Sequence, residues 1–258
     1  MKVINCNVNG IRSAAKKKFF TWAKAQKADF ICLQEVRAQE NQIIGAEFEL
    51  PGYSSYFIHA KKNGYSGVAI YAKIEPEKII KGLDIPFIDE EARYLQLDFA
   101  KFKLATIYVP SGTSGELRQN LKYKFLEIYQ KILAKQIHDQ LPYIICGDFN
   151  IAHRNIDIKN WKSNQKHSGF LPEERIWLDF IFDKIGFVDA YRYKNPDKIE
   201  YTWWSNFGNA WKNNVGWRID YQIISPQLKD RIISTEIYRE EKFSDHAPLI
   251  IEYDIFKY

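Results

Sequence analysis

Short apolar runs, rich in β-branched and aromatic residues and bounded by turn formers, recur along the whole chain. Such runs predict β-strands, here at residues 3–8, 30–33, 67–71, 94–99, 104–109, 143–146, 219–224 and 249–253. Helical periodicity appears between them, at residues 17–26, 117–140 and 172–185. This interleaving, with an expected meander formed by runs 67–71, 94–99 and 104–109, favours packed sheets with helices outside over one doubly wound parallel sheet.

Composition narrows the class of protein. No linker or low-complexity segment divides the 258 residues, so a single domain spanning residues 1–258 is expected. The three cysteines, Cys6, Cys32 and Cys146, lie inside apolar runs, which predicts buried, reduced thiols and a cytoplasmic protein. No secretory signal and no apolar stretch of ~20 residues is present, so no membrane association is expected. A net charge of +5 indicates nucleic-acid binding only weakly.

Polar side chains stand at one end of six of these runs. They are Asn7, Asn9, Glu35, Tyr108, Asp148, Asn150, Asp220, Asp245 and His246. If these ends converge, they form a polar pocket in a rigid frame. Phosphodiester cleavage needs a hard cation, a base for water and donors for the developing charge, and this set offers oxygen ligands for the cation, a base and donors. Glu35 is the best metal candidate, because it directly follows three apolar residues where a carboxylate is costly to bury.

Each residue also has a purely structural interpretation. A strand-end Asp or Asn, such as Asp148, most often makes an Asx turn. His246 alone is more often structural than catalytic, and an ion pair of Glu35 with Arg37 or Arg93 is the alternative to metal binding. The ordered set carries more weight than any one member.

The ordered motifs carry a family resemblance. In single-letter code they are NCNVNGIR at residues 5–12, LQE at 33–35, YVPSG at 108–112, GDFN at 147–150, GWRID at 216–220 and SDHAP at 244–248, with further matches at 151–160 and 169–175. Together they resemble the exonuclease III family of abasic-site endonucleases, within the endonuclease/exonuclease/phosphatase superfamily. The likeness runs from about residue 3 to residue 253. It implies a four-layer α/β sandwich, with two mixed sheets packed face to face and helices outside.

The resemblance also implies roles. Glu35 would bind Mg²⁺ (or Mn²⁺), with Asn9 and Asp245 nearby. The wider set of candidate metal ligands adds Asp148, Asn150 and His246. Asp148 and Asn150 would flank the attacking water and the phosphate, with Asn7 supporting Asp148. Tyr108 and His246 would contact the scissile phosphate, and Asp220 would orient His246.

Around the site, the resemblance makes Trp203, Trp217 and Ile219 the walls of a pocket for a flipped-out abasic sugar. Asn164 matches a phosphate-contacting position. Two departures stand out: Asn9 replaces the Asp of some members, removing one negative charge near the metal. His167 occupies a position that is often Asn, where it would narrow the pocket.

The implied function is incision of double-stranded DNA 5′ to abasic sites by a monomer, with 3′-phosphodiesterase action on blocked 3′ ends and 3′→5′ exonuclease activity. The chain also resembles the catabolite repression control proteins, RNA-binding regulators without nuclease chemistry. Here the acidic set of Glu35, Asp148, Asp220 and Asp245 is retained, and such groups repel nucleic acid unless a cation is used. The retained acidic set therefore favours a metal-dependent nuclease over an RNA-binding regulator without nuclease activity. A phosphatase or sphingomyelinase-like activity is a third alternative, against which the tryptophans and basic runs speak.

Overall fold

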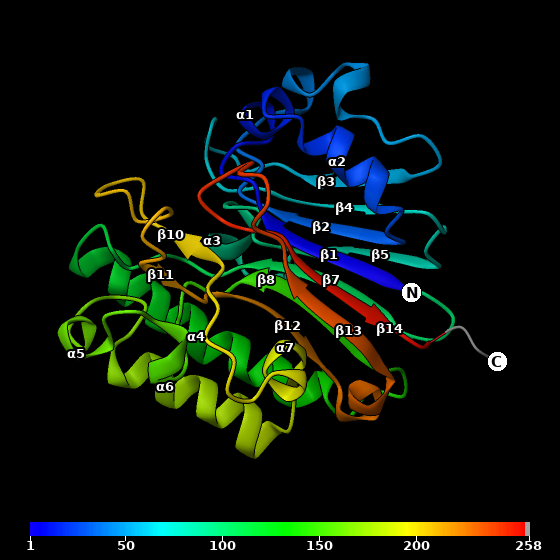
Figure 1. Cartoon of the computed structure of the whole chain (residues 1–258). Coiled ribbons are helices and arrows are strands. Elements are labelled where there is room, and N and C mark those ends of the chain that lie inside the picture. Colours follow the sequence, from blue (N-terminus) through cyan, green and yellow to red (C-terminus); the bar gives the residue numbers. More distant parts are fainter. Residues whose placement is uncertain (256–258) are drawn as a thin grey trace.

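Two six-stranded mixed sheets form the centre of the molecule (Figure 1). The computed structural model describes residues 1–255. The first sheet has the order β13 (Ile232–Ile237), β14 (Leu249–Tyr253), β1 (Lys2–Asn7), β2 (Phe30–Gln34), β4 (Val68–Ala72), β3 (Ser54–Ile58). The second has the order β5 (Lys78–Lys81), β6 (Tyr94–Asp98), β7 (Lys103–Tyr108), β8 (Tyr143–Asp148), β12 (Asp220–Ile224), β9 (Val188–Asp189). A two-stranded ribbon is made by β10 (Trp203–Trp204) and β11 (Gly216–Trp217).

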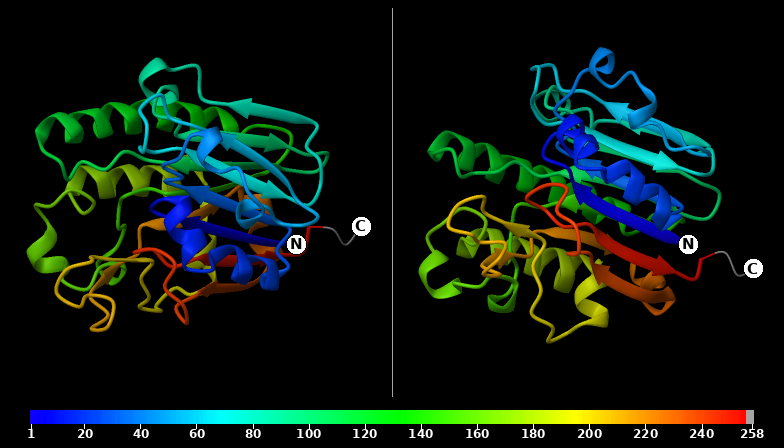
Figure 2. Two further views of the ribbon diagram at one scale, coloured as in Figure 1. Left: turned by 90° about the horizontal axis from the view of Figure 1, so that it is seen from above. Right: turned by 45° about the horizontal axis from the view of Figure 1, so that its top comes forward.

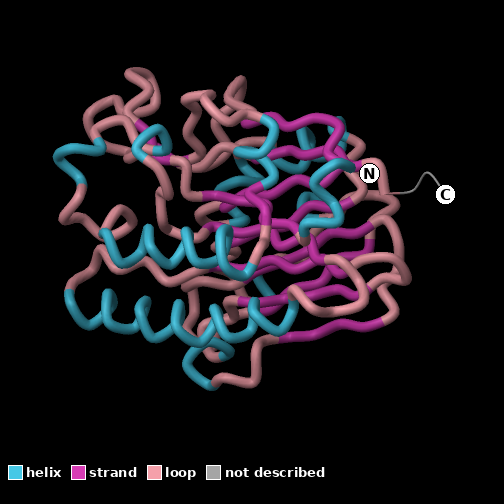
Figure 3. The backbone as a smooth tube through the Cα atoms, turned by 90° about the horizontal axis from the view of Figure 1, so that it is seen from below, coloured by secondary structure: helices cyan, strands magenta, loops and turns pink. Residues whose placement is uncertain are grey.

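Helices cover the outer faces of both sheets, which gives the expected four layers (Figure 2). On the first sheet lie α1 (Ile11–Lys16) and α2 (Phe19–Gln26). On the second lie α4 (Glu116–Gln136), α6 (Pro172–Asp179) and its π-helical continuation η4 (Phe180–Ile185), which run side by side (Figure 3). The shorter helices and turns are η1 (Glu40–Gln42), η2 (Ala46–Phe48), α3 (Pro86–Asp89), η3 (Asn155–Asp157), α5 (Trp161–Asn164), α7 (Ala190–Lys194) and η5 (Pro226–Arg231).

Alternation along the strands explains the layering. In β2, Phe30 and Cys32 face the core between the sheets, while Ile31 and Leu33 face the helices of the first sheet. Successive side chains of a strand point to opposite faces, so a strand that is buried on both faces reads as one continuous apolar run. The cysteines are buried and free, as predicted.

The expected meander of runs 67–71, 94–99 and 104–109 is wrong. β4 lies in the first sheet between β2 and β3, whereas β6 and β7 belong to the second. All five residues of β4 are buried, and an interior strand needs a partner on each side. The missing partners, β3 and β5, have mostly half-buried or exposed residues and therefore lack the apolar run that marks the other strands.

Polar side chains join the two sheets directly beneath the strand ends. The amide of Asn5 in β1 donates to the carbonyls of Gly147 (3.1 Å) and Tyr221 (3.2 Å) in the opposite sheet. Gln34 of β2 donates to Asn5 Oδ1 (2.7 Å) and to Thr106 Oγ1 of β7 (2.8 Å). These buried hydrogen bonds hold the two sheets in one arrangement, although Gln34 Oε1 has no partner among the described residues. Within residues 1–255, no helix combines the length and apolar character that a bilayer crossing requires.

Candidate active site

Strand register gathers the polar residues at one edge of the sandwich. β7 and β8 are parallel, with Tyr108 opposite Asp148, and β12 runs antiparallel to β8, with Asp220 opposite Asp148. In the other sheet β1 and β2 are parallel, so that Asn7 and the chain leaving β2 end at the same edge. Residues that are distant in sequence therefore become neighbours.

The centre of the site is a buried group of three potential metal ligands. One ligand atom each from Glu35, Asp148 and His246 lies within 4.8 Å of the others. The Asn7 amide bridges the two carboxylates, donating to Glu35 Oε1 and to Asp148 Oδ2, both at 2.8 Å. Arg37 makes an ion pair with the other oxygen of Glu35. Such a carboxylate-rich cluster is suited to a divalent cation with hard oxygen ligands.

Backbone strain coincides with this cluster. Asn9, Glu35 and Asn150 have φ values of 44°, 52° and 52°, in the left-handed region. A residue with a Cβ adopts this region at a cost, and such residues concentrate at functional sites. The strain is offset locally by two hydrogen bonds. The backbone N–H of Asn9 donates to Asn7 Oδ1 (2.9 Å), and the backbone N–H of Asn150 donates to Asp148 Oδ1 (2.8 Å).

The pKa of Asp148 is shifted by burial and by the charged groups around it. Burial, the nearby Asp220 and Glu35 raise its pKa to about 8, against the lowering effect of His246 and the Asn150 amide. The Asn150 side-chain amide also donates to Val109 O (2.9 Å) and approaches Asp148 Oδ2 (3.3 Å). Like charges and desolvation both disfavour an ionised carboxylate, so the site binds a proton unless positive charge is added.

His246 is held by Asp220. Its Nδ1 lies 2.9 Å from Asp220 Oδ2, and its Nε2 lies 3.9 Å from Asp148 Oδ2. Burial acts to lower the pKa of His246, but Asp220, Asp148 and Asp245 outweigh it and raise the pKa to about 10. The imidazole is therefore a cation at neutral pH, a donor more than a base.

Asp245 and Asn9 form the far side of the cluster. The side-chain amide of Asn9 donates to Asp245 Oδ1 (2.7 Å), and Trp203 Nε1 donates to Asp245 Oδ2 (3.2 Å). Burial acts to raise the pKa of Asp245, but His246 and these two donors hold it below its ordinary value. The carboxylate is thus ionised, and it lines the same cavity as Glu35.

Tyr108 presents a phenol to the same space. Burial and the charge of Glu35 raise its pKa well above the usual value, although Arg93 acts in the opposite direction. The Arg93 guanidinium stacks 4.6 Å from the Tyr108 ring centroid and donates to Tyr108 O (2.8 Å). The phenol stays protonated across the physiological range and remains a hydrogen-bond donor.

These residues form the floor of a cavity of about 850 Å³. Trp203 and Trp217 meet edge to face, with ring centroids 6.0 Å apart, and stand beside Ile219 in its wall. Asn164, the last residue of α5, and His167, in the turn that follows it, also line the cavity. The Asn164 amide already donates to Asn160 O (2.8 Å). The structure thus brings all the site residues named from the sequence to one cavity or its immediate surroundings.

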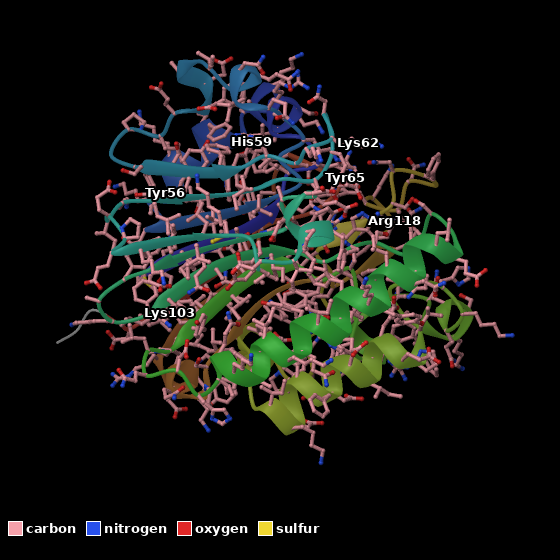
Figure 4. The ribbon with its side chains drawn as sticks, turned by 180° about the vertical axis from the view of Figure 1, so that it is seen from behind. Tyr56, His59, Lys62, Tyr65, Lys103 and Arg118 are labelled. Carbon is pink, nitrogen blue, oxygen red and sulfur yellow. The ribbon has the colours of Figure 1, made fainter. Side chains whose placement is uncertain are left out.

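A group of cationic side chains in the cavity lining was not found from the sequence; it is called the cationic rim below. Arg93 and Arg118 both donate to the Tyr65 hydroxyl (3.1 and 2.6 Å) and both pair with Glu91; Lys62 lies 5.5 Å from the Tyr65 ring centroid. Lys62, Tyr65 and Arg118 lie near one another in Figure 4, and all three line the cavity. The sequence signals were a basic pair at Lys61 and Lys62 and scattered arginines, which are ordinary for a solvated surface.

Comparisons with known proteins agree with this geometry. The family model described as the endonuclease/exonuclease/phosphatase family matches residues 4–246. The exodeoxyribonuclease of Bacillus subtilis is 36% identical over 252 residues, which cover 96% of this chain and 98% of the relative. A DNA-(apurinic or apyrimidinic site) endonuclease of Dictyostelium discoideum is 35% identical over 259 residues, covering 99% of this chain and 71% of the relative. Among solved structures, an AP endonuclease from Archaeoglobus fulgidus superposes with a TM-score of 0.90 at 29% identity, covering 99% and 100% of the two chains.

Fold, site and relatives define a hydrolase that cuts phosphodiester bonds, a nuclease of the DNA-repair class. The chain belongs to the endonuclease/exonuclease/phosphatase family, on its exonuclease III and AP endonuclease branch.

Proposed function

We propose that this protein is a Mg²⁺-dependent AP endonuclease that incises duplex DNA 5′ to an abasic site and leaves a 3′-OH. The same site would remove blocking groups from 3′ ends and act as a 3′→5′ exonuclease. The observation that carries the proposal is the cluster of Glu35, Asp148 and His246 at the floor of a cavity walled by two tryptophans. We further propose that the protein acts as a monomer.

The donor set fits a divalent metal. Glu35 would hold Mg²⁺, with Mn²⁺ as an alternative, and Asn9 and Asp245, which line the same cavity, would complete the shell directly or through water. Crowded carboxylates raise the pKa of Asp148, which is the repulsion that added positive charge relieves. When bound, the ion would supply Lewis acidity toward the phosphate oxygens.

The side chains divide the remaining work. Asp148 would take a proton from the attacking water once the charge of Glu35 is neutralised, and Asn150 and Asn7 hold its carboxylate in place. His246, kept cationic by Asp220, and Tyr108 would donate to the non-bridging oxygens of the scissile phosphate. As the new P–O bond forms, the P–O3′ bond breaks, and the departing 3′ oxygen takes a proton from a solvent water and becomes the 3′-OH.

The tryptophan wall supports the choice of an abasic substrate. A cavity lined by Trp203, Trp217 and Ile219 suits an apolar sugar edge without a base. The cationic rim at Arg118 and Lys62 suits the phosphate backbone on either side of it. His167, on an exposed loop in the same wall, narrows this space relative to a smaller Asn side chain.

The proposal is tested with one labelled duplex that carries a single abasic site. Purified protein is incubated with Mg²⁺, without metal, and with excess EDTA, and products are separated on a denaturing gel. Incision 5′ to the site in Mg²⁺ alone is expected, with a 3′-OH end that a polymerase extends. Binding without cleavage under all three conditions would overturn the proposal and favour an RNA- or DNA-binding regulator instead.

A further inference from the structure

A fully buried ion pair lies behind the loop wall of the cavity. Lys122 Nζ of α4 is 2.5 Å from Glu174 Oε1 in the first turn of α6, and neither side chain is exposed. Buried ion pairs gain little net stability, because desolvating both charges offsets their attraction. A fold that keeps this pair is expected to use it for something besides stability.

The pair connects a catalytic segment to the cavity loop. Besides Glu174, Lys122 Nζ donates to the backbone carbonyl of Asn150 at 2.8 Å. Glu174 Oε2 accepts from the backbone amides of Gly169 (2.6 Å) and Leu171 (3.1 Å). Two side chains thus fix the distance between Asn150 and the loop of residues 164–171.

The loop has little freedom to adjust on its own at this point. Gly169 has φ +94°, and a Cβ there would stand 3.0 Å from the Trp217 ring and 3.1 Å from Asn150 O. Its carbonyl accepts from the Ala152 amide at 2.8 Å. Gly169 therefore packs between the tryptophan wall and the chain that follows Asp148, held there by Glu174.

We propose that Glu174, neutralised by Lys122, is a positioning residue that sets the width of the cavity by holding Gly169 in loop 164–171. Because this loop carries Asn164 and His167, Glu174 determines how well an internal abasic sugar is accepted relative to a 3′-terminal group. The inference rests on the proposed function of the site. Among the described residues, the Glu174 side chain hydrogen-bonds the loop and α4 but none of Glu35, Asn9 and Asp245, so its effect is directed at the loop wall.

The test compares two uncharged double variants. Lys122→Met/Glu174→Gln keeps an oxygen that accepts from Gly169, while Lys122→Met/Glu174→Leu keeps none. Removing both charges together avoids stranding one of them, which would cost about 3–5 kcal/mol. Lys131→Met serves as a control, since Lys131 pairs with Glu127 on the exposed face of the same helix. Thermal unfolding establishes that each variant is folded.

The readout is the ratio of kcat/KM on an internal abasic-site duplex to kcat/KM on a nicked duplex with a blocked 3′ end. Small displacements of a positioned substrate have large kinetic effects. We expect the Leu variant to lose about tenfold in this ratio, mainly through KM for the abasic duplex. The Gln variant should stay within about threefold of the parent, and the control should not change.

A merely structural pair would lower both activities by the same factor, and a constant ratio in the folded Leu variant would overturn the inference. An equal shift in the Gln and Leu variants would also overturn it, because the acceptor for Gly169 would then be irrelevant. Failure of the unmodified protein to cut either substrate would instead reject the proposed function.

Discussion

Replacing Asp157 with Asn removes a carboxylate that supports the tryptophan wall from behind. Asp157 is fully buried, and its Oδ1 accepts from Arg218 Nε (2.8 Å) and Arg192 Nη2 (2.5 Å). Its backbone carbonyl also accepts from the Arg218 amide (2.7 Å). Arg218 lies between Trp217 and Ile219 in the sequence, and both of these residues line the cavity. Loss of the Asp157–Arg218 contact is therefore expected to disturb the cavity wall.

The magnitude follows from the pKa. Burial acts to raise the pKa of Asp157, but Arg218 and Arg192 lower it from 3.8 to about 2. A depressed pKa contributes stability that is complete above the unfolded value, near 4, and is lost as pH falls through the folded value. The shift corresponds to roughly 2.4 kcal/mol at neutral pH, of which about 1 kcal/mol is lost by pH 3. Asp157→Asn also breaks the ion pairs of Asp157 with Arg192 and Arg218, although Arg218 keeps Asp189 at 2.8 Å, so about 3 kcal/mol of destabilisation is expected at pH 7.

The assay is urea unfolding of the parent and of Asp157→Asn, followed by tryptophan fluorescence at pH 7 and pH 3. The stability gap between the two proteins should narrow by about 1 kcal/mol at the lower pH. Asp230→Asn is the control, because it removes an exposed carboxylate and should cost less than about 0.5 kcal/mol. A gap that is absent at pH 7, or that stays constant with pH, would refute the reasoning.

Three further outcomes are expected. Glu35→Ala or His246→Ala should reduce incision of an abasic-site duplex by roughly 10²–10⁴-fold with an unchanged circular dichroism spectrum; near-normal rates would reject the site assignment. His167→Asn should change the ratio of internal incision to 3′ trimming, measured on the two substrates in parallel, and an unchanged ratio would make the position neutral. Gly147→Ala should cost about 1–3 kcal/mol in thermal unfolding, since its Cβ would meet Ile107 O at 2.5 Å; a stable variant would contradict this packing.

Local pattern was sufficient for much of the fold and for the identity of the polar set. Strands such as β2 and β8 are predicted from unbroken apolar runs, because both of their faces are buried. Each run ends at the edge of the sheets that carries the site, and Glu35 and Asp148 stand at that edge as buried carboxylates. The burial of the cysteines followed from the same runs.

Contacts between residues that are distant in the sequence could not be predicted from these runs. The sequence does not say which sheet β4 joins, which of Arg37 and Arg93 pairs with Glu35, or that Lys122 meets Glu174, 52 residues away. Nor does it show Arg93 stacked on Tyr108. Apolar periodicity records how deeply each residue is buried, which is a property of one segment. A pairing depends on the closure of long loops and on the crossing of layers, and only the folded chain as a whole decides those distances.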